Sequence, residues 1–200
     1  MLLTVNQGDM KQFLLHMRKD PGRPTISFPP LNLAQMLGMC SQIASAMEYL
    51  STSRCVHRDL AARNILLTPN LDLKVACLAL CRDAYSRDYF PQHQQLIPLR
   101  WMAPEAVLEA EFSTKSDVWS FGVFVWEVFT HAEQPYANRS DEDLLKEIMA
   151  GGTPRLDFSP NCPTEVRNVI QKCTTLNPRD RPDFSELVVT IGSMVADSHL

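Results

Sequence analysis

The sequence lacks several patterns that define common functional classes. It has no excess of positive charge, because 19 Lys and Arg stand against 23 Asp and Glu, for a formal net charge of −4. No stretch of about 18 apolar residues occurs, and the first residues lack the basic region and apolar run of a signal peptide. We therefore expect no general attraction to nucleic acid, and no membrane span in this chain.

Paired cysteines are also missing. No two of the six cysteines form a Cys-x-x-Cys pair, and several lie among apolar residues, where a thiol packs as a small hydrophobic group. This usage predicts a reducing, cytosolic setting with no disulfide framework and no zinc site. The six positions are Cys40, Cys55, Cys77, Cys81, Cys162 and Cys173.

The most frequent pattern in the sequence is the spacing of apolar residues typical of α-helices. Between Leu33 and Leu50 the apolar residues recur at spacings of three and four, which predicts one long amphipathic helix. With 45% hydrophobic residues, the chain can bury a proper core. From residue 113 onward we predict helices at roughly 116–130, 140–150, 163–175 and 183–196, with Ser140 and Asp183 as N-caps and Pro163 in a first turn.

Strand signals are few. Two short runs, around Ile65–Leu67 and Leu73–Ala76, are rich in Ile, Leu and Val and are separated by turn-forming residues. They predict one small hairpin in a mainly α-helical chain.

The most informative segment is His57-Arg58-Asp59-Leu60-Ala61-Ala62-Arg63-Asn64. Phosphoryl transfer to a hydroxyl needs a carboxylate that accepts the hydroxyl proton and an oxygen ligand that holds magnesium against the phosphates. Asp59 and Asn64 offer these groups. Taken singly, each residue is equally typical of a solvated loop, so the hypothesis depends on the whole string.

Three further blocks follow in order: Pro98–Glu105 (Pro-Leu-Arg-Trp-Met-Ala-Pro-Glu), Ser116–Val123 and Pro178–Pro182 (Pro-Arg-Asp-Arg-Pro). Together with the first string they resemble the C-terminal lobe of a protein kinase domain, and Ala-Ala-Arg before Asn64 resembles the tyrosine-specific branch. The resemblance runs from about residue 8 to 192. It implies the large lobe of the protein-kinase-like fold, mainly α with a short hairpin at the catalytic loop and no small lobe. It assigns 1–196 to a partial kinase domain and 197–200 to a C-terminal tail.

The resemblance also implies roles for individual residues around the reaction. Asp59 becomes the proton acceptor, Arg63 lies near the transferring phosphate, and Asn64 is a magnesium and nucleotide ligand. Pro98 and Trp101 form the platform for a substrate tyrosine, although a tryptophan by itself is more typical of a core.

Two more implied roles are structural. Asp117 caps the backbone of the catalytic loop, and Arg181 pairs with Glu105. Because a buried Arg–carboxylate pair costs about 3–5 kcal/mol to break, the replacement Glu105→Ala is expected to unsettle the fold.

One departure from the family concerns the metal ligand. Cys77-Leu78-Ala79 stands where the family has Asp-Phe-Gly. Magnesium prefers hard oxygen ligands and rejects a soft cysteine sulfur, so we expect impaired catalysis. Cys77 is equally typical of a small apolar residue that closes a strand, which agrees with this expectation. Ala79 also lacks the backbone freedom of a glycine at a switching segment.

The other departure is at the start of the chain. Gly8–Leu14 matches the helix after the hinge, and no Gly-rich loop, strand lysine or partner glutamate precedes it. Family members use ATP and magnesium; here we expect weak nucleotide binding or none, and a fragment of a longer domain.

The segment Arg82–Phe90 resembles the activation loop of insulin-receptor-like kinases, with its last tyrosine replaced by Phe90. Tyr85 and Tyr89 are candidate phosphosites, or else two ordinary exposed loop tyrosines. A phosphate would add roughly −1.5 to −2 charges there, and Arg58 is placed by the resemblance to pair with it.

The combination of blocks is most similar to inactive receptor tyrosine kinases of the colon-carcinoma-kinase and Off-track type. This implies a parent that is a single-pass membrane receptor in planar-polarity and Wnt-linked signalling, with the present segment on the cytoplasmic side of the plasma membrane. We expect a pseudokinase that binds signalling proteins through surfaces such as the helix at 140–150. We expect these partners to include other receptor or cytosolic kinases. The alternatives are an ATP-dependent tyrosine kinase acting through Asp59 and Asn64 once its missing lobe is supplied, and a truncated sequence with no separate role.

Overall fold

The computed structural model describes residues 8–18, 30–68, 70–76, 86–92 and 95–198, and within them the chain is mainly helical, as the sequence predicts. The helices are α1 (Met10–Met17), α2 (Leu33–Thr52), α4 (Pro104–Leu108), α5 (Thr114–Phe129), α6 (Asp141–Met149), α7 (Thr164–Cys173) and α8 (Phe184–Asp197). The strands are β1 (Ile65–Leu67), β2 (Leu73–Val75), β3 (Phe90–Gln92) and β4 (Gln95–Ile97). Short 3-10 turns are η1 (Ala62–Asn64), η2 (Ser86–Asp88), η3 (Leu99–Trp101) and η4 (Pro178–Asp180).

Side-chain caps set where the helices begin. Ser140 starts α6, where its hydroxyl accepts the Asp143 N–H at 3.1 Å, and Asp183 starts α8 in a capping box. Such caps satisfy backbone N–H groups that have no partner inside the helix. The predictions of helices at 116–130, 140–150, 163–175 and 183–196 are confirmed to within a few residues. Pro163 is the cap residue before α7 and does not belong to its first turn.

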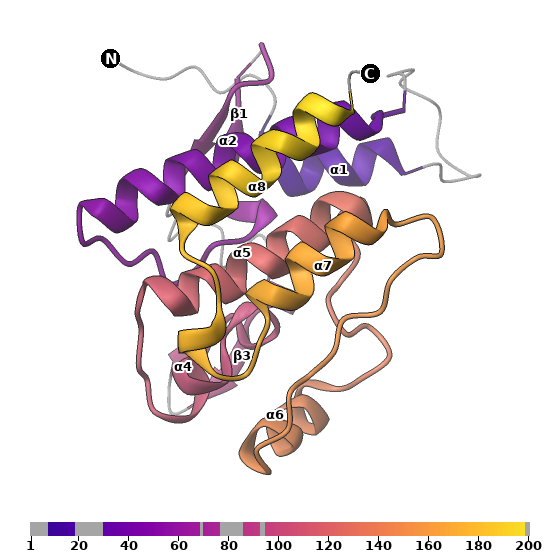
Figure 1. Cartoon of the computed structure of the whole chain (residues 1–200). Helices are drawn as coiled ribbons and strands as arrows, with labels where there is room; N and C mark the ends of the chain where they lie inside the picture. Colours follow the sequence, from indigo (N-terminus) through magenta and orange to yellow (C-terminus); the bar gives the residue numbers. More distant parts are fainter. Residues whose placement is uncertain (1–7, 19–29, 69, 77–85, 93–94, 199–200) are drawn as a thin grey trace.

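The long helix α2 lies along α8, and α5 and α7 form the next layer (Figure 1). Helix α5 occupies the centre, and every residue from Ser116 to Val128 is buried. Helix α6 lies at the end of the molecule farthest from α2. Because α5 is covered on all sides, it forms a rigid support from which polar side chains reach the functional loop.

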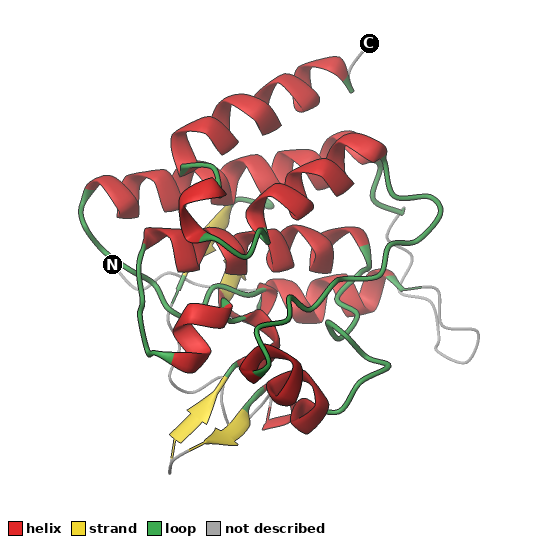
Figure 2. Cartoon of the chain, turned by 60° about the horizontal axis from the view of Figure 1, so that its bottom comes forward, coloured by secondary structure: helices red, strands yellow, loops and turns green. Residues whose placement is uncertain are grey.

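The predicted hairpin is present as β1 and β2, paired antiparallel with Ile65 opposite Val75 and Leu67 opposite Leu73. A second hairpin, β3 with β4, pairs Phe90 with Ile97, and the sequence did not predict it. Figure 2 shows β3 and β4 at the edge of the helical body.

No helix in the described ranges is long and apolar enough to cross a membrane. The four cysteines in the described ranges, Cys40, Cys55, Cys162 and Cys173, are free thiols. Burial raises the pKa of Cys40 and of Cys173, which suits their place in the core.

Candidate functional site

The loop that carries Asp59 is hydrogen-bonded to a side chain of α5. The two carboxylate oxygens of Asp117 accept the backbone N–H groups of His57 at 2.8 Å and of Arg58 at 2.9 Å. Burial raises the pKa of Asp117, and these two N–H groups partly oppose the rise. Asp117 thus anchors the backbone of the loop at His57 and Arg58. These contacts within the chain hold the loop without a bound ligand.

A second carboxylate from α5 supports the same loop further on. Glu127 is 0% exposed, and its Oε2 accepts the Ala62 N–H at 2.9 Å. This residue was missed by the sequence reasoning, which found no motif around it. A Glu inside an otherwise apolar helix was the available signal, because buried carboxylates are rare unless they are paired.

Both oxygens of Asp59 are engaged by groups of this chain. The Arg63 Nη2 donates to Oδ1, and the Tyr89 hydroxyl donates to Oδ2 at 2.7 Å. The Arg63 Nε in turn donates to the Tyr89 oxygen at 3.0 Å. A tyrosine hydroxyl therefore lies at the carboxylate where, by the family resemblance, a substrate hydroxyl would lose its proton.

The side chain of Arg63 lies between two aromatic rings. Its guanidinium carbon is 4.7 Å from the Tyr89 ring centre and 4.3 Å from that of Trp101. Burial, the largest influence, disfavours its charge, but Asp59, Tyr89 and nearby carboxylates raise the pKa of Arg63 overall. Arg63 therefore remains a permanent cation, which is stacked and buried.

Asp88, the residue before Tyr89, also contacts this cluster. Asp88 is 6% exposed, forms an ion pair with Lys11 of α1, and lies 3.5 Å from the Arg63 Nη1. Lys11 also lies over the Trp101 ring at 5.6 Å. The sequence reasoning missed both Lys11 and Asp88. Their contact joins segments 77 residues apart, which local patterns do not reveal.

Asn64 presents one oxygen for a metal. Its Nδ2 donates to the Asp59 carbonyl at 2.6 Å, whereas its Oδ1 is buried and has no hydrogen-bond partner in the described ranges. An orphaned buried oxygen of this kind suits a metal ligand. No group of three or more His, Cys, Asp or Glu that could hold a metal occurs among the described residues.

Cys77 stands at the position where the family has its metal-binding aspartate, and it lies outside the described residues. Its sulfur does not replace the hard anionic oxygen that magnesium requires, and Asn64 supplies only a neutral one. The residues present therefore do not fit a magnesium–nucleotide site of the family's kind.

The two residues of the predicted substrate platform, Pro98 and Trp101, are both buried in this structure. Pro98 is buried, and Trp101 is 1% exposed beneath Arg63 and Lys11, with its carbonyl accepting the Ser120 hydroxyl at 2.7 Å. Neither side chain presents an open face to a substrate in this conformation. The Trp101 ring is covered by the Arg63 guanidinium at 4.3 Å and the Lys11 Nζ at 5.6 Å from its centre.

Of the two candidate phosphosites, the structure describes only Tyr89. Tyr89 is 5% exposed, so it is neither an accessible phosphosite nor an exposed loop tyrosine in this structure. Tyr85 lies outside the described residues. Arg58 is exposed, with its guanidinium carbon 5.1 Å from the Phe112 ring centre, so its pairing with a phosphate stays a prediction.

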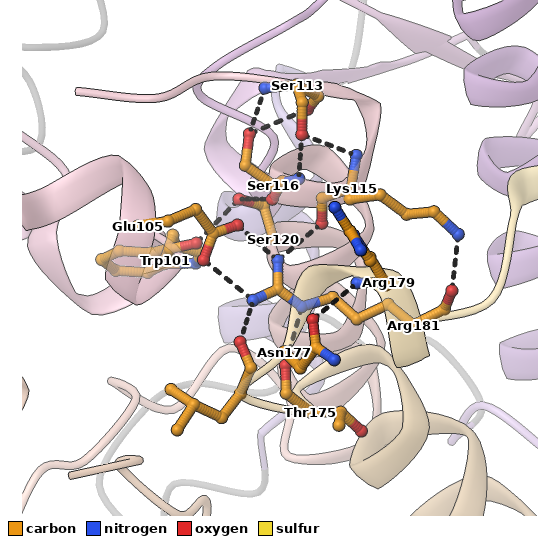
Figure 3. A network of polar contacts seen from close by, with 11 residues as sticks. Trp101, Glu105, Ser113, Lys115, Ser116, Ser120, Thr175, Asn177, Arg179 and Arg181 are labelled. Atoms are coloured by element: carbon orange, nitrogen blue, oxygen red, sulfur yellow. Dashed lines mark hydrogen bonds and ion pairs between the residues drawn. The ribbon is translucent and has the colours of Figure 1, made fainter. Parts of the chain in front are cut away.

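A separate polar network fixes the base of the lobe (Figure 3). Arg181 is 2% exposed and donates to both carboxylate oxygens of Glu105, at 2.6 and 2.9 Å. It also donates to the backbone carbonyls of Lys115 and Thr175. The two residues thus meet as expected, in a bidentate pair that joins α4, α5 and the turn before α8.

Comparison with known proteins agrees with this architecture. The family model described as protein tyrosine and serine/threonine kinase matches residues 1–191. The chain belongs to the protein kinase family, and its helices form the C-terminal lobe of that fold.

Individual relatives narrow the class. The chain is 47% identical over 195 residues to inactive tyrosine-protein kinase 7 of Mus musculus and 45% identical to that of Homo sapiens, covering 97% of this chain in both cases. It is 39% identical over 188 residues to the insulin-like growth factor 1 receptor of Bos taurus, covering 94% of this chain. The chain spans 18% of the length of the first two relatives and 29% of the third.

Proposed function

We propose that this chain is a catalytically impaired tyrosine-kinase lobe, a pseudokinase that serves as a binding module in signalling. The observation that carries the proposal is the state of Asp59, whose two carboxylate oxygens are taken by Arg63 and by the chain's own Tyr89. In this conformation the Tyr89 hydroxyl occupies the place at Asp59 Oδ2 that the hydroxyl of an incoming substrate would take, and Arg63 binds Oδ1.

The metal ligands support the same proposal independently. Of the pair expected from the family, Asn64 retains an oxygen and Cys77 replaces the carboxylate. Losing one metal ligand removes several kcal/mol of transition-state stabilisation, and each 1.36 kcal/mol corresponds to about a factor of ten in rate. The names of the Mus musculus and Homo sapiens relatives include the word "inactive", which agrees with this view.

The wider setting forms part of the proposal. Relatives named as receptors support a place on the cytoplasmic side of the plasma membrane as part of a single-pass receptor. Residues 1–196 would form the partial kinase domain, with 197–200 as a tail. Partners would be signalling proteins, among them other receptor or cytosolic kinases, and a link to planar polarity and Wnt signalling rests on the family resemblance.

The test uses the domain with its upstream lobe supplied. We expect no magnesium-dependent phosphorylation of a tyrosine peptide above the level of the Asp59→Asn control, and no change in thermal stability with magnesium and ATP. A clear thermal shift together with phosphorylation that Asp59→Asn abolishes would establish the rival function, an ATP-dependent tyrosine kinase acting through Asp59 and Asn64. The upstream sequence, examined for a Gly-rich loop and a strand lysine, is the matching check for nucleotide binding.

A further inference from the structure

A hollow of about 460 Å³ is lined by segment 153–158, by α7 and by the residues that follow α7. None of its lining residues belongs to the loop that carries Asp59. Leu156 and Ile170, both buried, form part of its apolar wall, and Leu176, which also lines it, is 46% exposed. A volume in this range accommodates a small ligand or a side chain of a partner. The hollow can therefore receive an aliphatic or aromatic side chain.

Three polar side chains on the same hollow have their donor groups available. Arg155 and Gln171 are exposed, and neither of these side chains nor the Thr153 hydroxyl forms a hydrogen bond or ion pair with any described residue. Arg155 is also the one charged residue among those that line the hollow, all of which lie in the described ranges. A guanidinium with free N–H groups beside neutral donors suits a carboxylate.

A larger hollow of about 850 Å³, which shares Phe158 with the first, has lining residues of the opposite charge. Glu133 and Asp157 line it, and no Lys or Arg does. Glu133 forms an ion pair with Arg18 at 3.0 Å, whereas the Asp157 carboxylate has only the Asn138 amide, at 3.4 Å, among the described residues. A negatively charged partner is therefore favoured at the first hollow and disfavoured at the second.

Contacts with the core hold the walls of the first hollow in place. The indole N–H of Trp126 in α5 donates to the Asp157 carbonyl at 2.6 Å, which ties segment 153–158 to α5. Helix α7, which forms another wall, packs against the same helix. Arg167 lines neither hollow, and its guanidinium donates to backbone carbonyls of residues 159–162. Because these walls are already ordered, a partner that binds here loses little entropy through ordering them.

We propose that this hollow binds an acidic segment of a partner protein, with an apolar side chain in the hollow and a neighbouring carboxylate bound by Arg155. The inference rests on the proposed role of the chain as a binding module, and it names the chemistry of one partner. It does not depend on the contacts of Asp59, because the two sites share no residue.

Selection from a library of random heptapeptides, displayed on phage and presented to the full chain, tests the proposal. The library is first depleted on the double variant Arg155→Glu with Leu176→Ser, which removes peptides that bind other surfaces. We expect the peptides that remain to combine Asp or Glu with an adjacent Leu, Ile or Phe. Recovery of no peptide after this depletion, or of basic or uncharged peptides, would overturn the proposal.

Fluorescence anisotropy with a synthetic copy of the most enriched peptide then measures each contribution. Arg155→Glu should raise the Kd by about tenfold or more, because repulsion replaces attraction, and Arg155→Lys by about threefold, because the charge remains. Leu176→Ser should raise it by about fivefold, since apolar contact is lost. The matched control Lys74→Glu changes the charge equally at an exposed residue of β2 outside the hollow, and its Kd should stay within about twofold. Equal Kd values for Arg155→Glu and Lys74→Glu would contradict the assignment.

Two further measurements separate the possible outcomes. Circular dichroism checks that the variants at Arg155 and Leu176 fold, as expected for exposed side chains. A peptide with phosphoserine in place of its Glu should bind no more than about threefold more tightly; a gain of tenfold or more would reassign the hollow to phosphopeptides. All binding is measured without magnesium or ATP. Phosphate transfer by the two-lobed domain would refute the pseudokinase proposal alone, whereas failure to bind peptide would refute this inference alone.

Discussion

Among single residues, Leu71 has a backbone conformation that its side chain does not favour. It lies in the turn between β1 and β2 with φ of 63°, and its N–H donates to the Thr68 carbonyl at 3.0 Å. An L-residue in the left-handed region costs about 1–2 kcal/mol, whereas glycine adopts it freely. The side chain is 37% exposed, so little packing offsets this cost.

Leu71→Gly should therefore stabilise the fold by about 0.5–1 kcal/mol, after the larger backbone entropy of glycine is taken into account. The free energy of unfolding from urea denaturation measures the change. Leu96→Gly is the matched control, because Leu96 is 44% exposed and lies in a strand, where glycine destabilises. Equal destabilisation of the two variants would contradict the assignment of strain to Leu71.

Tyr89 gives a second test on the residue scale. Burial raises its pKa to about 12, with Asp59 adding to the rise and Arg63 opposing it. The fold thus favours the neutral phenol, and the stability that this contributes is complete below the ordinary pKa of 10.0 and is lost as pH rises toward 12.

Ultraviolet absorbance titration should show one tyrosine with a midpoint near 12. This transition should vanish in Tyr89→Phe and persist in Tyr49→Phe, whose side chain is 71% exposed. A Tyr89 transition at the ordinary value of 10.0 would mean that the hydroxyl is not held between Asp59 and Arg63 in solution.

On the scale of elements, the contact between α5 and α7 depends on Gly122. A Cβ at this position would lie 2.6 Å from the Cys173 Cβ and 3.2 Å from the Thr174 Cγ2. The two helices would have to move apart, because neither neighbouring atom is the end of a flexible side chain.

Gly122→Ala should destabilise the chain by about 1–3 kcal/mol, although alanine is the better helix former. Gly192→Ala on the exposed side of α8, where a Cβ meets no atom within 4 Å, should instead stabilise by up to about 1 kcal/mol. Thermal unfolding of both variants separates close packing from helix propensity. Stabilisation in both would show that α5 and α7 have room to adjust.

Element by element, the sequence predicted what depends on local chemistry. Ser140 and Asp183 marked two helix starts because caps act on adjacent backbone groups. The β3 and β4 hairpin was missed, since Pro91 lacks a backbone donor and ordinarily argues against a strand. In this hairpin the pairing of Phe90 with Ile97 outweighs that preference.

On the scale of the whole molecule, contacts between residues far apart in the chain are the ones that the sequence does not predict. The string around Asp59 and Asn64 indicated the candidate site because the family motif is contiguous. The ion pair of Lys11 with Asp88 could not be predicted from a contiguous motif, because only tertiary folding brings α1 beside η2. The same holds for Tyr89, which the sequence identified as a loop tyrosine without its position against Asp59.

Glu105→Ala tests another distant contact, the pair of Glu105 with Arg181. It leaves the buried Arg181 guanidinium without its carboxylate, so we expect a loss of about 3–5 kcal/mol in the free energy of unfolding. Guanidinium chloride denaturation measures it, with Glu109→Ala, an exposed residue at the end of the same helix, as the control. A loss below about 1 kcal/mol would contradict the role given to the pair.

The separation of Glu105 and Arg181 along the chain also has a kinetic consequence. The two residues are 76 positions apart, so the pair closes a long loop that includes α5, α6 and α7. Closing such a loop costs entropy that is recovered only after the intervening helices have packed. Its energy should therefore govern mainly the rate of unfolding rather than the rate of folding. The pair thus acts as a latch that sets how long the native lobe persists once it has formed.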